Sequence, residues 1–513
     1  MSLRKTSSRW RTGKDCFSFC PRRFPSLSFS TSTPTPSLLL LLPLLLLPRL
    51  LISLSASPLS LSPPSRPSYV LQTYARPDVV FVKGQGSTLW DAHGNSYLDF
   101  TAGIAVNSLG HGHPAWLSAV REQAGELAHV SNLYHTAPQA RLAKKLVEAA
   151  GPWASRAFFC NSGTEANEAA IKFARKFAKV KKGVDPYDAG VPPSAAPWKL
   201  LSFDNCFHGR TMGALALTYK VQYKTPFEPI MPGVSLLFLF VCFFRVRVYL
   251  REALPKLKKK NSLKNSQKPL QVDSVPYLDL AAAEAVLARG ETCAVFVEPL
   301  QGEGGVFASS QAFLEGLRRA CDRHGALLVY DEVQVGLGRT GSLWAHEPYG
   351  AGCLPDVMTL AKPLAGGLPV GSVLLTQAVA DAMAPGDHGS TFAGNPLVCR
   401  AAEAAFDVIA DPGFLRNVAE RGEQLREGLR AALEGVGAVV EVRGRGLICA
   451  VQLDRPAGNV CTIARERHGL LVLTAGKGDV VRLVPPLVLT EAEVDEGVRK
   501  LAAAIREDLA TSG

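Results

Sequence analysis

Hydrophobic and polar positions follow two rhythms along most of the chain. Short apolar runs predict strands at 293–299, 326–331, 356–361 and 371–376, and apolar residues at helical spacing predict helices at 115–128, 137–150 and 165–180. Strands that alternate with helices in this way indicate a parallel sheet with helices on both faces. Ligands of such sheets bind beyond the carboxyl ends of the strands, so we expect chemistry in the loops that follow these runs.

The pattern changes near residue 396, where two long helical stretches precede strands near 439–453 and 480–484 and a final helix at 490–509. This order is typical of a smaller α+β domain. At the other end, folding sequence starts near Tyr69. We therefore expect a leader at 1–68, an N-terminal segment of the small domain at 69–125, a large domain at 126–390, and the rest of the small domain at 391–513.

The leader has the composition of an organelle transit peptide. Residues 1–66 are rich in Arg, Ser, Pro and Leu and hold nine basic residues against one acidic residue. The leucine-rich run at 38–51 could instead be the core of a secretory signal, but Pro43 and Pro48 interrupt it and it is too short to span a bilayer. We expect import into a mitochondrion or chloroplast.

Residues 233–270 do not fit the strand–helix rhythm. An apolar block, Leu236–Phe244, precedes a lysine-rich stretch that ends near Lys268. The block is too short for a transmembrane helix. Our hypothesis is an insertion outside the fold, such as intron sequence retained in a gene prediction, and transcript sequencing across codons 230–272 tests it. Its presence in every mature message would refute the hypothesis. The alternative is a membrane-surface segment, an apolar block beside a basic run.

Charge and cysteine usage exclude two classes of function. The net charge of +11 comes from the leader and the 233–270 segment, which each hold nine basic residues and one acidic residue, so the remainder carries −5. This distribution argues against binding of nucleic acid. Eleven cysteines are scattered without a CxxC pair or a Cys/His cluster at metal spacing, which indicates reduced core thiols and no metal site.

Lys362 and Asp331 each occupy an unusual place in the pattern. Lys362 follows an apolar run and is set among small residues, where a lysine can be a desolvated amine that readily forms a Schiff base, although most lysines are simply exposed. Asp331 ends the apolar run that starts at Leu327. A carboxylate buried there needs a cationic partner, and the pyridine nitrogen of pyridoxal phosphate (PLP) is one. The alternative is an aspartate that caps the next turn.

Two segments are candidate phosphate sites. Ser162, Gly163 and Thr164 lie between a strand-like run and a helix, where backbone N–H groups and the helix dipole favour an anion. An ordinary N-cap is the equal alternative there. Gly389–Pro396 offers two hydroxyl groups ahead of another helix.

Three further features suggest a ligand with carboxylates. Phe207 and Arg210 follow the predicted strand 199–203 and could cover a planar cofactor and bind a carboxylate. A Gly-rich loop at 297–305 carries two carboxylates. Arg482 interrupts an apolar strand, so we expect it to have an anionic partner.

The motifs together resemble those of class III (ornithine-type) aminotransferases of PLP fold type I. They are, in order, NSGTEANEAA, FHGRTMGALALT, VEPLQGEGG, LLVYDEVQVGLGRTG, TLAKPLAGGLPVG and GSTFAGNP. The resemblance covers 78–505 apart from the insertion. It implies an α/β fold with a mostly parallel seven-stranded sheet and a smaller α+β domain. It also implies PLP as cofactor and a homodimer with shared active sites, without nucleic acid or stable membrane insertion.

The resemblance also implies a role for each candidate residue. Lys362 would be the Schiff-base lysine and Asp331 the partner of the pyridine nitrogen. The other cofactor contacts would be Ser162, Gly163 and Thr164 at the phosphate, Thr391 at the phosphate across the dimer interface, Phe207 on the ring and Gln334 at the ring oxygen.

The substrate roles follow in the same way. Arg210 and Ser390 match positions that contact acetylornithine in the family. Arg482 matches the arginine that takes the α-carboxylate of glutamate, and Glu303 matches the glutamate that neutralises it when the other donor binds. The implied reaction is transamination of N2-acetylornithine with 2-oxoglutarate, giving N-acetylglutamate 5-semialdehyde and glutamate in arginine biosynthesis. Two half-reactions at one site predict ping-pong kinetics.

Several alternatives share these features. Ornithine δ-aminotransferase and 4-aminobutyrate aminotransferase would use the same lysine and aspartate, whereas FHGRTMGALALT with NSGTEANEAA favours acetylornithine. Glutamate-1-semialdehyde aminomutase fits less well because Arg210 and Glu303 suggest a two-substrate enzyme. Two alternatives are not enzymes: a catalytically silent scaffold with the PLP fold, and a membrane-surface protein that uses the insertion. Purified protein without bound PLP would favour the scaffold.

Overall fold

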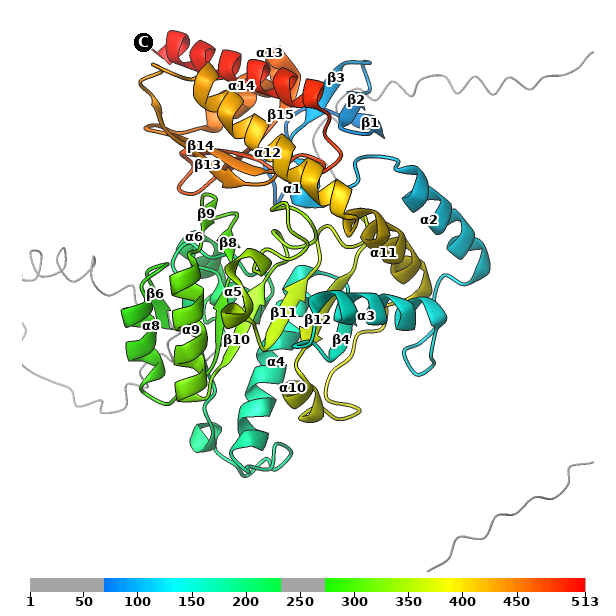
Figure 1. Ribbon diagram of the computed structural model, residues 1–513, viewed down its shortest axis with the longest axis vertical. Helices are drawn as coiled ribbons and strands as arrows, with labels where there is room; N and C mark the ends of the chain where they lie inside the picture. The colour runs from blue at the N-terminus through cyan, green and yellow to red at the C-terminus, as the bar shows by residue number, and fades with distance from the viewer. Residues whose placement is uncertain (1–68, 232–272, 513) are drawn as a thin grey trace, which may run out of the picture. The chain divides into compact units, whose positions relative to one another are not determined.

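The computed structural model describes residues 69–231 and 273–512 (Figure 1). The expected leader at 1–68 and the insertion at 233–270 lie outside the described residues, so both interpretations stay predictions. Across the described ranges, no helix has the length and hydropathy to cross a membrane. Within the same ranges, no group of three or more His, Cys, Asp or Glu side chains could hold a metal ion.

A seven-stranded sheet forms the centre of the large domain. Its strand order is β4-β12-β11-β10-β7-β5-β6, and of these seven strands only β12 runs antiparallel to its neighbours. The strands are β4 (Arg156–Cys160), β5 (Lys199–Phe203), β6 (Asp273–Val275), β7 (Thr292–Val297), β10 (Leu327–Asp331), β11 (Val357–Leu360) and β12 (Gly371–Leu375). The predicted fold class, with its mostly parallel seven-stranded sheet, is confirmed.

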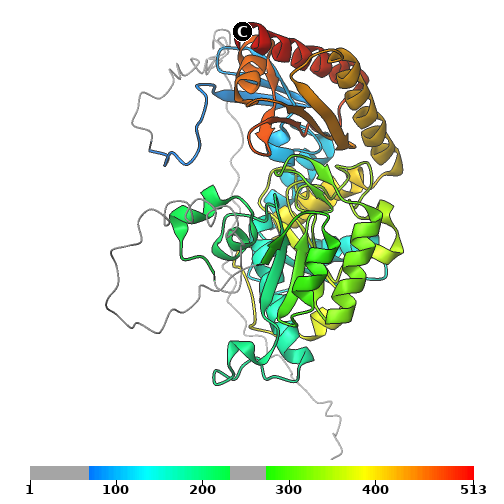
Figure 2. The same ribbon diagram turned by 90° about the vertical axis from the view of Figure 1, so that its left-hand side faces the viewer.

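Helices cover both faces of this sheet because its central strands are apolar on both sides. Val295 and Tyr330 belong to one core cluster and Phe296 and Val329 to another, as the two-residue repeat of a strand requires. The first face carries α3 (Ala137–Ala150), α8 (Leu280–Leu287) and α9 (Gln311–His324), and the second carries α4 (Gly163–Lys181). The two green helices α8 and α9 lie side by side along the sheet in Figure 2.

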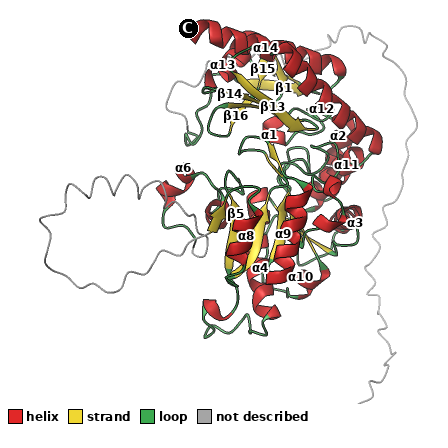
Figure 3. Ribbon diagram, turned by 60° about the vertical axis from the view of Figure 1, so that its left-hand side comes forward, coloured by secondary structure: helices red, strands yellow, loops and turns green. Residues whose placement is uncertain are grey.

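The small domain is built from both ends of the described chain. One sheet has the order β1-β2-β3-β15 and the other β13-β14-β17-β16. Its strands are β1 (Phe81–Gln85), β2 (Thr88–Asp91), β3 (Ser96–Asp99), β13 (Val439–Arg445), β14 (Ile448–Leu453), β15 (Leu470–Leu471), β16 (Leu473–Ala475) and β17 (Val480–Leu483). Its main helices, drawn in red in Figure 3, are α12 (Pro412–Ala432), α13 (Gly458–His468) and α14 (Glu491–Ser512). The parallel pair of β3 with β15 joins the N-terminal segment to the C-terminal part.

The helices α2 (Pro114–Glu126) and α11 (Pro396–Ile409) pack against each other, and α11 also packs against α3. Buried residues of α11, such as Cys399 and Phe406, belong to the core of the seven-stranded sheet. The expected domain limits stay a prediction, and this packing supports a C-terminal limit after α11 instead of at residue 391. The remaining short elements are α1 (Ala102–Ala105), α5 (Met212–Leu217), α6 (Val221–Lys224), α10 (Gln377–Asp381), β8 (Leu300–Gln301) and β9 (Phe307–Ala308).

Candidate active site

Five parallel strands end at the same edge of the large sheet, and each is followed by a predicted site residue or its neighbour. The strands are β4, β5, β7, β10 and β11. The structure therefore brings together segments that are far apart in the sequence, namely those that carry Ser162, Phe207, Glu298, Asp331 and Lys362. This is the edge at which ligands bind in open α/β sheets.

Asp331 is a buried carboxylate held by three donors. Its Oδ2 accepts from Nδ2 of Asn167 at 2.8 Å and lies 2.7 Å from Nδ1 of His208, and its Oδ1 accepts from the backbone N–H of Val333 at 3.0 Å. Burial lowers the pKa of His208, but the neighbouring Cys206 and Asp331 raise it, and the net result is well above the ordinary value. Asp331 thus caps the next turn and also has the cationic neighbour that a buried carboxylate needs.

Lys362 follows β11, is partly buried, and is close enough to Asp331 for the two charges to interact. Burial and the nearby Arg482 lower the pKa of Lys362 to about 8, against the opposing influence of Asp331, Glu298 and Glu303. A lysine with such a pKa is partly a neutral amine near neutral pH. The amine can then attack a carbonyl carbon or accept a proton.

The start of α4 combines an N-cap with a place for an anion. Oγ of Ser162 accepts from the backbone N–H of Glu165 at 3.3 Å. The first N–H groups of a helix have no acceptor within the helix, so those of Gly163 and Thr164 point to where an anion can bind. A Cβ on Gly163 would lie 2.4 Å from Cγ1 of Val333, so this position accepts glycine alone without a shift of its neighbour. The two alternatives from the sequence are therefore compatible.

Arg482 comes from β17 of the small domain and is almost fully buried. Its Nη2 lies 2.9 Å from Oε2 of Glu303, and its Nη1 donates to Oε1 of Gln334 at 3.1 Å. Burial raises the pKa of Glu303. The nearby cations Arg482 and Lys220 lower it by more than burial raises it, so the net shift of the pKa is downward. The anionic partner expected for Arg482 is present, and it is Glu303.

Phe207 and Arg210 lie in the loop after β5. The backbone N–H of Phe207 donates to Oε1 of Glu298 at 2.9 Å. The guanidinium carbon of Arg210, an exposed residue, stands 3.4 Å from the centroid of the Tyr223 ring. The backbone N–H of Arg210 donates to Oγ1 of Thr164 at 3.3 Å, which ties this loop to the start of α4.

Ser390 and Thr391 lie in the loop before α11. Oγ of Ser390 accepts from Nδ2 of Asn161 at 2.7 Å, so this hydroxyl lies next to the loop that starts α4. Thr391 and its neighbour Phe392 are exposed. An exposed Thr391 is free to contact a second subunit, and its predicted role across a dimer interface stays a prediction.

Sequence reasoning missed three residues at this site, Asn167, His208 and Lys220, and it gave no role to Glu298, one of the two carboxylates of the 297–305 loop. His208 stands next to the predicted Phe207 in FHGRT, and Asn167 is a polar residue inside the alanine-rich start of α4, so both carried a weak signal. Burial raises the pKa of Glu298 to about 7, which marks it as an unusual carboxyl group. No pattern in the sequence singled out Lys220.

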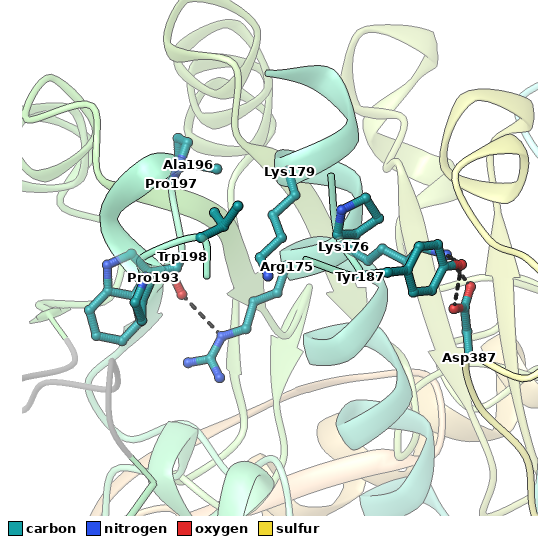
Figure 4. A pocket seen from close by; sticks show the side chains of 11 residues that line it. Arg175, Lys176, Lys179, Tyr187, Pro193, Ala196, Pro197, Trp198 and Asp387 are labelled. Atoms are coloured by element: carbon teal, nitrogen blue, oxygen red, sulfur yellow. Dashed lines mark hydrogen bonds and ion pairs between the residues drawn. The ribbon is translucent and has the colours of Figure 1, made fainter. Parts of the chain in front are cut away.

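A pocket of about 340 Å³ lies elsewhere, between α4 and the segment before β5 (Figure 4). None of the predicted site residues lines it. One of its cations has local partners, because Nζ of Lys176 donates to the Tyr187 hydroxyl at 2.6 Å and pairs with Asp387. At 1.5 Å per helical residue, Lys176 is about 20 Å along α4 from Gly163. This pocket is therefore separate from the candidate active site.

The donor set at the sheet edge fits PLP. Asp331 is a buried anion able to pair with a protonated pyridine nitrogen, and Nε2 of His208 behind it is buried without a hydrogen-bond partner among the described residues. The start of α4 provides donors for a phosphate, and Lys362 provides an amine of lowered pKa. Phe207 and Gln334 lie in loops of the same edge. Their predicted contacts with the cofactor stay predictions.

Comparison with known proteins identifies the family. The family described as "Aminotransferase class-III" matches residues 70–505. A mitochondrial acetylornithine aminotransferase from Alnus glutinosa is 50% identical over 84% of this chain and 84% of that protein. A succinylornithine transaminase from Yersinia enterocolitica is 40% identical over 88% of this chain and 98% of that protein.

Solved structures agree with this match. The ornithine aminotransferase from Toxoplasma gondii ME49 superposes with a TM-score of 0.73 at 31% identity, over 86% of this chain and 94% of that one. The N-acetylornithine aminotransferase from Stenotrophomonas maltophilia superposes with a TM-score of 0.66 at 34% identity, over 85% and 98%. The chain therefore belongs to the class-III aminotransferases, and pyridoxal phosphate is its cofactor.

Proposed function

We propose that this chain transfers the δ-amino group of N2-acetylornithine to 2-oxoglutarate. The observation that carries the proposal is the pair of Arg482 with Glu303, in a site where Arg210 offers a second guanidinium. 2-Oxoglutarate has a carboxylate next to its reacting carbon, whereas N2-acetylornithine has its carboxylate far from the reacting amine. A site for both needs one arginine that can be neutralised and another that stays available. The identity with relatives named as acetylornithine aminotransferases supports this choice.

When bound, PLP accepts the electron pair released as a C–H bond of the substrate breaks. Asp331 would hold the pyridine nitrogen, and Ser162, Gly163 and Thr164 would hold the phosphate. Nζ of Lys362 would remove the proton from the carbon that bears the amine and deliver a proton to the cofactor instead of back to that carbon. The lowered pKa of Lys362, about 8, suits this role because the amine can accept and release a proton near neutral pH.

Arg210 and Arg482 each orient a different substrate carboxylate. Arg210, with Ser390 near it in the family pattern, binds the distant carboxylate of N2-acetylornithine while Glu303 neutralises Arg482. When 2-oxoglutarate enters, Arg482 leaves Glu303 and binds the carboxylate next to the reacting carbon. An arginine–carboxylate contact of this kind can be bidentate, and it therefore fixes orientation as well as charge.

The assembly we propose is a homodimer in which Thr391 of the partner subunit completes each phosphate site. The exposed Thr391 and Phe392 support this assembly. Co-expression of Lys362→Ala and Thr391→Ala chains tests it. In a hybrid dimer of shared sites, one site has both defects and the other has neither, so activity should return. Failure of hybrids to regain activity would contradict the shared site.

We also propose a mitochondrial location. The relatives from Alnus glutinosa, Dictyostelium discoideum and Neurospora crassa carry the word mitochondrial in their names, which supports this location over the chloroplast. Expression of residues 1–68 fused to a fluorescent protein would test both organelles.

An amine-donor panel with 2-oxoglutarate tests the substrate. N2-acetylornithine, N2-succinylornithine, ornithine and 4-aminobutyrate are compared by kcat/KM at matched concentrations. We expect N2-acetylornithine to give the highest value and free ornithine to be poor. Because Arg210 is the proposed contact for the distant carboxylate, 4-aminobutyrate, whose carboxylate lies one carbon closer to its amine, should be poor as well. A higher kcat/KM for ornithine or 4-aminobutyrate would contradict the proposal and favour an ornithine or a 4-aminobutyrate aminotransferase.

A further inference from the structure

Glu303 has two cationic partners, one on each carboxylate oxygen. Oε2 lies 2.9 Å from Nη2 of Arg482, and Oε1 lies 3.1 Å from Nζ of Lys220. The Arg482 side chain is 2% exposed, whereas those of Lys220 and Glu303 are 22% and 21% exposed. Lys220 is the N-cap residue of α6, on a different segment from either partner.

The second cation matters at the moment when Arg482 must leave Glu303. A largely buried carboxylate without a cation is costly, because its lost hydration is not replaced. With Lys220 in place, Glu303 still has a charged partner after Arg482 has turned to a substrate carboxylate. Without Lys220, release of Arg482 would leave Glu303 unpaired, and Arg482 would stay bound to it more tightly.

We propose that Lys220 is the alternative partner of Glu303 and thereby sets how readily Arg482 binds 2-oxoglutarate. Lys220 is a positioning residue in this account, because it acts through Glu303. The inference rests on the proposed function in one respect, namely that the α-carboxylate of 2-oxoglutarate binds Arg482.

The surroundings of Lys220 favour this role over a purely structural one. Its Nζ stands 5.6 Å from the centroid of the Tyr223 ring, against which Arg210 also stacks. Lys220 therefore lies among the charged groups of the candidate active site. The nearby Lys224 differs, since it is buried and its Nζ donates to the backbone carbonyl of Ala216 at 2.7 Å.

The test is the variant Lys220→Met, which keeps the length of the side chain and removes the charge. We expect the KM for 2-oxoglutarate to rise about three- to fivefold, the upper part of the range expected for one partly exposed charged contact. The KM for the amine donor and the kcat of both half-reactions should change by less than about twofold. The Kd of glutarate, a dicarboxylate that cannot react, should rise by the same factor in calorimetry of the holoenzyme. The conservative variant Lys220→Arg should restore most of the affinity.

A double-mutant cycle separates this proposal from direct substrate binding by Lys220. In a Glu303→Gln background, Lys220→Met should have no further effect on 2-oxoglutarate or glutarate. An effect that persists in that background would overturn the proposal and assign Lys220 to the substrate itself. Unchanged affinity in the single variant would also overturn it.

Controls keep the outcome interpretable. Lys199→Met removes another lysine, which lies at the start of β5, away from the carboxyl edge of the sheet, and whose Nζ lies 2.7 Å from Oε2 of Glu291. This variant should leave the KM values for both substrates unchanged. Circular dichroism shows whether the variants fold, and Lys220→Gln offers a second neutral side chain if Lys220→Met does not. Because glutarate binding does not depend on the amine donor, failure of the donor panel and failure of this proposal are distinguishable.

Discussion

Lys362 differs from an ordinary lysine only through its surroundings. In the sequence it is one lysine among small residues, and in the structure burial and Arg482 lower its pKa to about 8. Asp331 is likewise only the last residue of an apolar run in the sequence, whereas in the structure its carboxylate has three hydrogen-bond partners. At the scale of single residues, chemistry therefore depends on neighbours that are distant in sequence.

Replacement of Lys362 by alanine should abolish turnover without loss of the fold. We expect kcat to fall about a thousandfold or more, because positioned proton transfer alone contributes roughly 10²- to 10⁴-fold. Steady-state kinetics and circular dichroism measure the two effects. Near-wild-type turnover in a folded variant would exclude Lys362 from the reaction.

The lowered pKa of Lys362 also predicts how stability depends on pH when the cofactor is removed. Between about pH 8 and the ordinary value of 10.5, the unfolded chain binds more protons at Lys362 than the folded chain does. This lysine therefore destabilises the cofactor-free fold below pH 8, and the penalty fades as pH rises toward 10.5. Lys362→Met should raise the Tm of the cofactor-free protein at pH 7 and change it little near pH 10.5. Equal gains at both pH values would contradict this cause.

Arg482→Ala should damage the half-reaction with 2-oxoglutarate most. The reason is the loss of the guanidinium that we propose binds the carboxylate next to the reacting carbon. Single-turnover measurements of each half-reaction would show a rise in KM for 2-oxoglutarate of about a hundredfold, since a truncated buried charged contact costs roughly 2–5 kcal/mol. If both half-reactions were unaffected, the assignment of Arg482 would be wrong.

At the scale of helices and strands, close packing fixes where the start of α4 lies. The start of α4 must approach the loop after β10 closely, and Gly163 makes this possible because it has no side chain to meet Val333. The cap at Ser162 uses one N–H group of α4 and leaves others for an anion. The N-cap is present in the structure, and the phosphate site stays a prediction that is compatible with it.

Gly163→Ala tests this packing. The added Cβ would lie 2.4 Å from Cγ1 of Val333, so the start of α4 or Val333 must shift. We expect a loss of about 1–3 kcal/mol in the free energy of unfolding and weaker retention of PLP. Gly125→Ala in α2 is the matched control, since no atom lies within 4 Å of its added Cβ, and it should be neutral or slightly stabilising. Similar effects of both changes would show that Gly163 has no special packing role.

The whole molecule joins two domains at the site. Arg482 comes from β17 of the small domain, while Glu303 and Gln334, which it contacts, follow strands β8 and β10 of the large domain. The switch that we propose for two substrates therefore spans both domains. In the sequence, the segment 233–270 lies between α6 and β6, and among the described strands β6 is at the edge of the large sheet and pairs with β5 alone.

Deletion of residues 233–270 tests whether this segment belongs to the fold. Because it precedes the edge strand β6 in the sequence, we expect the shortened chain to keep its activity and to gain solubility, as a basic and apolar segment is removed. The amine-donor assay and a thermal melt compare the two chains. A large loss of activity together with a lower Tm would show that the segment is part of the enzyme.

The sequence by itself determined the alternation of strands with helices, a parallel sheet and the residues that stand at its carboxyl edge, because hydrophobic periodicity and small-residue motifs are local. It also pointed to Lys362, Asp331 and an anionic partner for Arg482. The family resemblance named Glu303 as that partner, and the structure pairs the two side chains. Only the tertiary structure decided that Asn167 and His208 hold Asp331 and that Lys220 shares Glu303 with Arg482. The physical reason is that burial, charge pairing and pKa arise from residues that the chain brings together across many positions, and no local pattern encodes those contacts.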